Sequence, residues 1–227
     1  MTVMQNPREP VPRALKEALR GDFAAVVPLA APWCRALALA LPTLLVLSAA
    51  ILVLARSRGA AVLFSATGGG VSILEWLAGL ALAWLALREA VPGLGVGAGR
   101  SLLALAGAVS LQLSLGLLIW QRAAAGLTGP EAMAVGAQCA TIEGVIGLPH
   151  LAIATWLALR ALPVRPRWSG ALAGAAAGLL ADAVWHLACA RNDLEHILVW
   201  HFGATVAMTL LGAVTGSFWS RRVRATP

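Results

Sequence analysis

The sequence has few charged residues. Asp, Glu, Lys and Arg together make up 12% of its 227 residues, whereas 59% are hydrophobic and the mean hydropathy is +0.81. A soluble domain usually has roughly 25% charged and 45–50% apolar residues. This composition excludes an ordinary soluble domain and predicts an integral membrane protein. The net charge of +7 does not indicate direct binding to nucleic acid, because the basic residues are spread between apolar runs and form no single stripe.

Cysteine and catalytic motifs are also scarce. The three cysteines include no CxxC pair, which argues against a disulfide scaffold and against a structural zinc knuckle. The chain has no HExxH motif and no nucleophile elbow, so no motif supports an enzyme. Residues 1–22 are polar and contain prolines but no apolar core, so we expect no cleaved signal peptide. Tyrosine is absent, which leaves nine tryptophans as the interfacial aromatic residues.

Six apolar runs are each long enough to cross a bilayer, whose core requires about 20 helical residues. These runs are Trp33–Ala55, Val71–Val91, Ser101–Trp120, Thr141–Leu162, Trp168–Ala188 and Ile197–Trp219. We therefore expect an all-α integral membrane protein, a bundle of six transmembrane helices in which only the connection Gln121–Ala140 is long. Glycines at every fourth position predict close packing of the last two helices. They are Gly170, Gly174, Gly178, Gly212 and Gly216.

The two tails are expected on the cytoplasmic side. Residues 1–32 form the N-terminal tail, residues 33–220 the transmembrane domain and residues 221–227 a basic C-terminal tail. In the first tail, Leu15, Leu19, Phe23 and Val26 recur at three- and four-residue spacing, which is typical of a short amphipathic helix. Lys and Arg are enriched in both tails and in the even-numbered loops, which places both termini in the cytoplasm of a multi-pass protein.

Ionisable residues are concentrated in the stretch Ala181–His201. It holds Cys189, three of the four histidines and three of the ten acidic residues. An ionisable group inside a membrane span is a functional candidate, because lipid offers it no hydrogen-bond partner. Asp182, His186 and Cys189 fall at i, i+4 and i+7, so they share one face of a helix.

A second polar stripe lies on the fourth apolar run. Cys139, Glu143 and His150 fall at i, i+4 and i+11, again on one helical face. Antiparallel neighbouring helices can bring the two stripes together, and His196 and His201 can enter from the sixth span. With the topology above, Cys139 and Cys189 lie at the outer side, where disulfides can form and persist. Cys34 lies alone on the inner side.

Two chemistries suit this set of residues. One is a reversible Cys139–Cys189 disulfide, or oxidation of an exposed thiolate. The other is a site for a soft divalent metal ion at the outer face, with Cys139, Cys189 and His186 as ligands. No cofactor is certain. The structural alternative is that the thiols are core residues and that Asp182 satisfies His186. Glu75, near the outer end of the second span, is expected to be an interfacial carboxylate.

The residues of the last third resemble the NrsF-type family of six-span membrane anti-sigma factors, which sequester an extracytoplasmic-function (ECF) sigma factor. The resemblance extends more loosely over the rest of the chain. It rests on Cys139-x-x-x-Glu143 with Leu148-Pro149, Arg165-Pro166, the small-residue run Ala171–Gly178, His186-Leu-Ala-Cys189, Trp200-His201 with Gly203, and Arg221-Arg222. The tail segment Leu15–Leu29 is similar to that family's N-terminal leader. This chain departs from the family in a Pro-rich extension before the leader, and in having His201 where an aromatic residue is frequent.

The resemblance implies a bacterial inner-membrane protein whose tail contacts the sigma factor. The tail residues that it implies for this contact are Leu15, Leu19, Asp22, Phe23, Val27 and Pro28. It also implies that Cys139 and Cys189 take part in sensing oxidative or heavy-metal stress, which releases the sigma factor. The alternatives are a membrane thiol redox protein, a small metal or proton transporter built on Asp182, Glu143 and the histidines, and a structural membrane protein.

Overall fold

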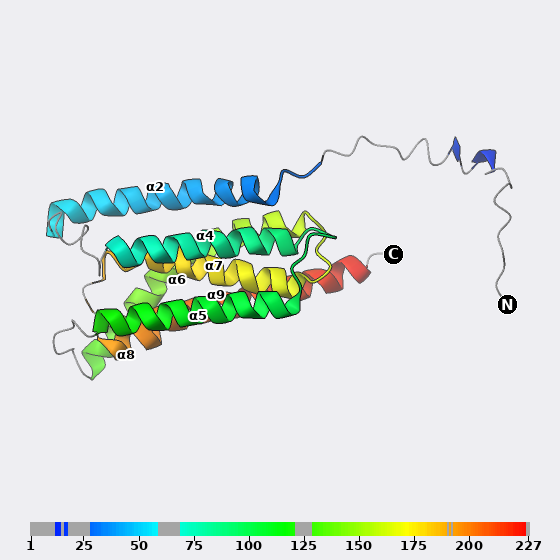
Figure 1. The fold of residues 1–227 in the computed structure, drawn as a ribbon. Coiled ribbons are helices and arrows are strands. Elements are labelled where there is room, and N and C mark those ends of the chain that lie inside the picture. Colours follow the sequence, from blue (N-terminus) through cyan, green and yellow to red (C-terminus); the bar gives the residue numbers. More distant parts are fainter. Residues whose placement is uncertain are drawn as a thin grey trace. The chain divides into compact units, whose positions relative to one another are not determined.

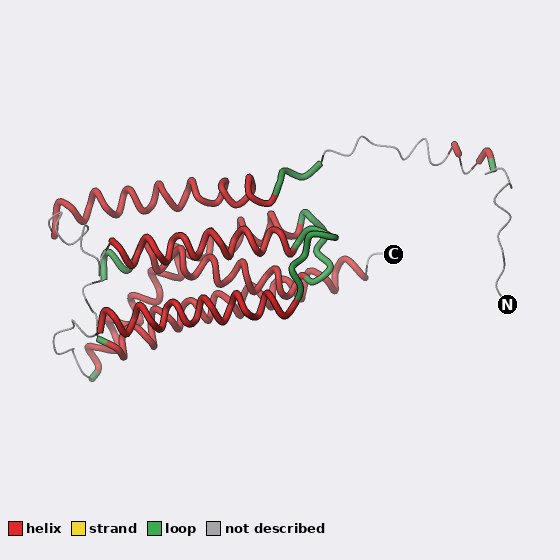
Figure 2. Tube along the Cα trace, in the orientation of Figure 1, coloured by secondary structure: helices red, strands yellow, loops and turns green. Residues whose placement is uncertain are grey.

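The chain folds as a set of long helices. The computed structural model describes residues 12–14, 16–17, 28–58, 69–120, 129–189, 191 and 193–225, and every secondary-structure element in those ranges is a helix (Figures 1 and 2). A helix pairs each backbone N–H with a C=O of the same segment, which is the only way for a single apolar segment to satisfy its backbone without water. The all-helical part of the predicted fold class is thus confirmed.

Six helices are long. They are α2 (Pro32–Arg58), α4 (Val71–Glu89), α5 (Ala98–Trp120), α6 (Pro130–Leu159), α7 (Pro166–Trp185) and α9 (Phe202–Ala225). Two short elements, α8 (Leu194–His196) and the π-helical η2 (Ile197–His201), lead directly into α9. Five helical segments of the described chain are long and apolar enough to cross a membrane, and α7 is not among them. The predicted count of six spans therefore stays a prediction.

The fourth helix begins earlier than the sequence predicts. We expected a loop through Gln121–Ala140 and a span from Thr141, but α6 begins at Pro130. Gly129 adopts φ +72° immediately before it, and Pro130 occupies the first turn, where its missing N–H costs nothing. The loop prediction is wrong for Pro130–Ala140, and Cys139 lies within a helix.

Helix α7 is the centre of the bundle. Every residue from Ser169 to Val184 is buried, and the helix packs most extensively against α9, then against α4 and α6. Its Ala- and Gly-rich composition explains this position, because small side chains let neighbouring backbones approach closely. A Cβ on Gly170 would collide with the carbonyl oxygen of Gly212, and one on Gly216 with that of Pro166. The close packing predicted from the glycine rows is confirmed.

The two ends of the bundle differ in character. At one end lie the start of α2, the turns Val91–Gly97 and Leu162–Arg165, and the end of α9 (Figure 1). We call this the Arg165 end. At the other, the Cys189 end, α7 stops and α8 begins (Figure 1). At the Arg165 end the buried carboxylate of Glu89 accepts hydrogen bonds from the N–H groups of Val96 and Gly97, and it forms a 2.8 Å ion pair with Arg165.

Helix α2 joins the bundle through buried apolar residues, Ala36, Leu39 and Ala40, and through a few polar contacts. The guanidinium of Arg35 donates to the carbonyl oxygens of Leu157 on α6, at 2.9 Å, and of Leu87 on α4, at 3.4 Å. About two turns further along α2, the hydroxyl of Thr43 lies 2.8 Å from Nε2 of His150 on α6. These hydrogen bonds join α2 to α6 and α4, and the helix packs more extensively against α4 than against α6, while many of its leucines face outward.

The chain divides into two units, residues 1–30 and 31–227. In the first unit, the N–H of Lys16 donates to the carbonyl oxygen of Pro12, which closes one helical turn. Leu15, Leu19, Asp22, Phe23, Val26 and Val27 lie outside the described residues, so the predicted amphipathic helix is not tested. Pro28 is described, and it is exposed and not helical.

Candidate functional site

Buried polar side chains from several helices meet at the Cys189 end. We call this group the cysteine–histidine cluster. Its members are Glu75 on α4, Cys139 and Glu143 on α6, Asp182 on α7, Cys189 after α7, His196 on α8 and His201 on η2. Burial of so many polar groups is costly unless they satisfy one another or bind a ligand. The cluster is therefore the candidate site.

The two cysteines are neighbours. Cys139 is buried on α6, and its Sγ lies 3.8 Å from that of Cys189. Cys189 follows the last turn of α7, where its N–H donates to the carbonyl oxygen of Trp185. Its Sγ also lies 3.3 Å from Nε2 of His196. The two stripes predicted from helical spacing thus do meet, although the structure contains both thiols in the reduced form.

His201 joins the thiols to two carboxylates. Its Nδ1 lies 2.8 Å from Oδ1 of Asp182 and 2.5 Å from Oε1 of Glu143. A ring nitrogen carries at most one hydrogen, so it can donate to only one of these oxygens at a time. The contact orients the imidazole and leaves Nε2 for other partners. Ligand atoms of Cys139, Cys189, His196 and His201 all lie within 4.8 Å of one another.

A buried glutamine extends this network into the bundle. The side-chain amide of Gln112 on α5 donates to Oδ2 of Asp182 at 2.8 Å and to the hydroxyl of Thr205 on α9 at 3.0 Å. Sequence reasoning missed Gln112. Its signal was a single amide in the apolar run Ser101–Trp120, where such a group requires a partner on another helix.

A π-helical turn positions the two histidines. His196 and His201 are five residues apart, and on an ideal α-helix that spacing separates two side chains by about 140°. The segment Ile197–His201 is π-helical, with wider turns than an α-helix. The ring centroids of His196 and His201 are consequently only 5.2 Å apart. Gly136 on α6 makes room for this turn, because a Cβ there would collide with the indole of Trp200.

Asp193 shapes the rim of the site. Its Oδ1 accepts the N–H of His196 and so caps α8, while Oδ2 accepts from Nε of Arg191 at 2.8 Å. Partial burial opposes ionisation of this carboxyl, but the Arg191 guanidinium and the capping hydrogen bond together lower the pKa of Asp193. Asp193 therefore stays negatively charged at neutral pH. A cavity of about 280 Å³ borders it, lined also by His196, Glu195 and Trp200.

Two other predictions require correction. Glu75 is not an interfacial carboxylate. It is only 3% exposed, and its carboxyl group lies beside that of Asp182. Ser72, Glu75 and Gly79 share the face of α4 that contacts α7. Glu75 is buried because it lies on this face. His150, which shares a stripe with Cys139 and Glu143, lies farther along α6 and bonds Thr43 instead.

The predicted metal ligand His186 is not in the four-residue group. It caps the end of α7, and its ring centroid lies 6.3 Å from that of His201. Both oxygens of Asp182, which we had considered as a partner of His186, accept from His201 and Gln112. The geometry thus brings His196 and His201 together with both cysteines. Cys34, on the first turn of α2, lies at the opposite end of the bundle.

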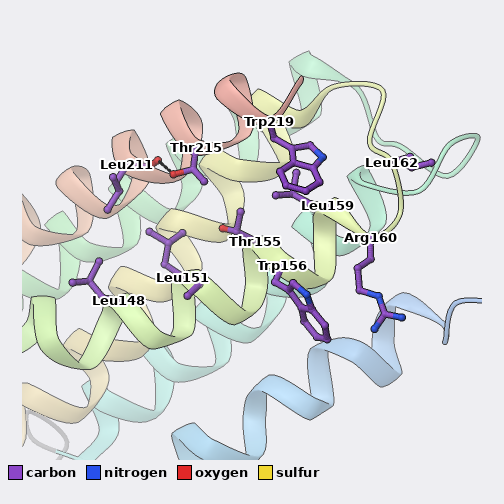
Figure 3. Close-up of a pocket in the computed structure, with 11 residues that line it drawn as sticks. Leu148, Leu151, Thr155, Trp156, Leu159, Arg160, Leu162, Leu211, Thr215 and Trp219 are labelled. Atoms are coloured by element: carbon purple, nitrogen blue, oxygen red, sulfur yellow. Dashed lines mark hydrogen bonds between the residues drawn. The ribbon is translucent and has the colours of Figure 1, made fainter. Parts of the chain in front are cut away.

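A larger groove lies between α6 and α9, away from the cluster. Its volume is about 740 Å³, and Leu148, Leu151, Trp156 and Trp219 are among the side chains that line it (Figure 3). The hydroxyl of Thr215 is already bonded to the carbonyl oxygen of Leu211. Arg160 stands at the edge, over the ring of Trp156. Such walls suit acyl chains better than a polar substrate.

Comparison with known proteins identifies the family. No curated protein and no solved structure matches the chain. A family model does, over residues 19–221, and its description is negative regulator of sigma F. The match spans the first five long helices, α9 up to residue 221, the cysteine–histidine cluster and the end of the N-terminal tail. The resemblance inferred from the sequence is confirmed, and the family's description makes the partner a sigma factor. The chain belongs to the NrsF family of negative regulators of sigma F.

Proposed function

We propose that this protein is a membrane-spanning anti-sigma factor of the bacterial inner membrane. In this proposal its cytoplasmic N-terminal tail holds an ECF-type sigma factor, and reaction of Cys139 and Cys189 at the periplasmic face releases it. The observation that carries the sensing role is the 3.8 Å separation of the two sulfur atoms at one end of the bundle. The sigma factor as partner follows from the family.

The outer surface of the bundle supports insertion in a bilayer. Large apolar side chains face outward along the helices, among them Leu41, Leu45, Leu103 and Val145, each at least 65% exposed. Soluble monomers rarely expose contiguous apolar surface on this scale. In lipid the same side chains are at their most favourable. The excess of Lys and Arg in the tails and even-numbered loops supports a cytoplasmic Arg165 end and an outer Cys189 end.

The thiol pair can respond to oxidation without large rearrangement. In forming a disulfide, the two thiols lose two protons and two electrons to an oxidant such as a peroxide, which is reduced to water. The sulfur atoms must approach from 3.8 Å to the bond length of about 2.05 Å. Cys189 lies just after α7 and Cys139 in the third turn of α6, so the movement shifts the end of α7 relative to α6.

Helix α6 offers a physical connection from this site to the tail. It carries Cys139 and Glu143 at the Cys189 end, then His150, and finally the Leu157 carbonyl that Arg35 binds. Both later contacts are to α2, which is continuous in sequence with the tail. A shift of α6 is therefore transmitted to the helix from which the sigma-binding segment extends. A change of about 1.4 kcal/mol in binding free energy alters the sigma-factor affinity tenfold.

Cysteine substitutions test the sensing step. The full-length protein is expressed in its membrane, and sigma-factor binding is followed by co-purification before and after addition of peroxide or cadmium. Cys189→Ser is expected to bind the sigma factor like the wild type but to retain it under stress. Cys34→Ser is the matched control, since its thiol lies at the opposite end, and it should both bind and release. If Cys189→Ser releases normally, or never binds, the thiol is not the sensor.

Tail substitutions in the same full-length protein test the output. Leu19→Asp and Phe23→Asp place a charge on the apolar face of the predicted amphipathic helix, and each should abolish co-purification of the sigma factor. Lys16→Gln, on the polar face, is the control and should leave binding unchanged. Normal binding by both aspartate variants would exclude the tail as the contact.

A further inference from the structure

We infer that Cys139, Cys189, His196 and His201 form a four-ligand site for one soft divalent metal ion of the zinc and cadmium class. The positions of the four side chains support the site independently of any function. Its role in regulation rests on the proposed function, in which the sensor then becomes a metal–thiolate centre and not only a thiol pair. His196 and His201 replace the single histidine, His186, that sequence spacing favours.

The spacing of the ligand atoms fits a tetrahedral ion. With metal–sulfur and metal–nitrogen bonds of about 2.3 and 2.0 Å, tetrahedral geometry places two sulfur atoms about 3.8 Å apart and sulfur and nitrogen about 3.5 Å apart. The observed Sγ–Sγ distance is 3.8 Å, and the distance from Cys189 Sγ to His196 Nε2 is 3.3 Å. All four ligand atoms lie within 4.8 Å of one another, so small side-chain adjustments complete the site.

The surroundings of His201 are those of a metal-bound imidazole. In metal sites the second ring nitrogen of a histidine ligand almost always donates to a carboxylate or a carbonyl group, which fixes the tautomer and orients the ring. Here Nδ1 of His201 contacts Asp182 and Glu143, and Gln112 holds Asp182 in turn. A buried histidine supported in this way has its Nε2 available as a ligand, and His201 belongs to the group with both sulfur atoms.

Charge and ligand type select the ion. Two thiolates neutralise one divalent cation, so the metal and its sulfur ligands carry no net charge where Cys139 and His201 are buried. Sulfur and imidazole ligands in tetrahedral arrangement favour zinc or cadmium over calcium or magnesium, which prefer oxygen. The 280 Å³ cavity borders His196 and is lined also by Asp193, Arg191 and Glu195; because Asp193 is paired with Arg191, Glu195 supplies the negative charge that attracts cations to the rim.

Metal binding and disulfide formation compete for the same sulfur atoms. A disulfide cannot form while both sulfur atoms stay bound to the ion, so oxidation of the pair by a peroxide, which is reduced to water, releases the ion. One site would therefore respond both to an oxidant and to a heavy-metal ion, the two kinds of stress expected of the sensor. Exchange of zinc for cadmium, or oxidation with loss of zinc, changes the geometry at the point where α6, α7 and α8 meet.

The test measures metal binding by the full-length protein, reduced and purified in detergent. Cadmium is titrated in while the ultraviolet absorption of cadmium–thiolate bonds is recorded, and bound metal is counted after gel filtration. The wild type should bind one ion per chain. Cys189→Ser and His201→Ala should lower the affinity at least a hundredfold, and Asp182→Asn about 10–100-fold. His186→Ala and Cys34→Ser should bind like the wild type.

A second measurement avoids variants that fail to fold. Wild-type protein in native membranes is treated with a thiol-alkylating reagent, with and without zinc, and the modified cysteines are identified by mass spectrometry. Zinc should protect Cys139 and Cys189 and leave Cys34 unprotected. The inference is wrong if zinc protects neither cysteine, or if His201→Ala binds cadmium as tightly as the wild type. Neither measurement involves the sigma factor, so intact sigma-factor release with no metal binding would overturn this inference alone.

Discussion

Gly178 links helix packing to the candidate site, and its replacement by alanine is the most direct test of the structure. A Cβ on Gly178 would lie 2.7 Å from Cα of Thr205 on α9 and 2.9 Å from its Cγ2. Ordinary van der Waals contact begins at 3.4 Å, so α7 and α9 must separate by roughly 0.7 Å at this point. The nearest atom belongs to the backbone and cannot turn away.

The expected cost follows from this overlap. Overpacking a tightly packed interior by one methyl group typically costs about 1–3 kcal/mol. Gly107 on the exposed face of α5 is the matched control, because a Cβ there meets nothing within 4 Å. At that position alanine should stabilise the helix by about 0.5–1 kcal/mol. The two Gly→Ala variants should therefore differ by roughly 1.5–4 kcal/mol in their free energy of unfolding.

The assay is unfolding of the purified protein in mixed micelles of increasing SDS content, followed by far-ultraviolet circular dichroism. Because Thr205 also accepts the hydrogen bond from Gln112, Gly178→Ala should in addition increase the alkylation rate of Cys139, whose network loses its alignment. Equal stability of Gly178→Ala and Gly107→Ala would show that α7 and α9 are not in backbone contact, and the reasoning would be refuted.

Two further substitutions address the contact between α2 and α6 and the rim of the site. Thr43→Val removes the hydroxyl beside Nε2 of buried His150 and should cost about 1–3 kcal/mol in the same unfolding assay; Thr215→Val, whose exposed hydroxyl bonds only its own helix, should cost less than half as much. Asp193→Asn keeps an oxygen that can cap α8 but removes the ion pair with Arg191, so it should destabilise the protein at pH 7 by roughly 0.5–1 kcal/mol. The lowered pKa of Asp193 means that its contribution is present above the ordinary aspartate pKa and is lost as the pH falls through the lowered value. The wild type and Asp193→Asn should therefore converge in stability as the pH falls through that lowered pKa, and a difference that stays constant as the pH falls through and below it would contradict the assignment.

The helices and the pairing of the cysteines could be predicted from the sequence. Apolar runs long enough to be helices are visible in any hydropathy profile, and helical spacing placed Cys139 and Cys189 on faces that meet. The beginning of α6 could not be found in this way. Its first residues, from Pro130, include Glu131 and Gln138, and hydropathy locates apolar segments and not helix ends. The only local signal was the Gly129-Pro130 pair.

The sequence could not show which histidines lie nearest the two thiols, although His196 and His201 were expected to enter the cluster. Spacing rules assume 3.6 residues per turn, and on that basis His186 pairs with Asp182 while His196 and His201 face different directions. The π-helical turn at Ile197–His201 changes this, and hydrophobic periodicity gives no sign of it. Burial of Glu75 likewise depends on which face of α4 meets α7, which follows from tertiary packing.

The glycine contacts between α7 and α9 have a mechanical consequence. At the glycines, the backbone of each helix contacts the backbone of the other, so α7 and α9 cannot slide past each other without first separating. We call this rigid pair of helices the spine. Among its described residues, helix α2 has no glycine contact of this kind, and it joins the bundle through Ala36, Leu39 and Ala40 and the hydrogen bonds of Arg35 and Thr43. In the proposed mechanism, motion that starts at the cysteines is taken up on the α2 side and not by this spine. Because α2 follows the N-terminal tail in sequence, the proposal assigns the moving output to that tail.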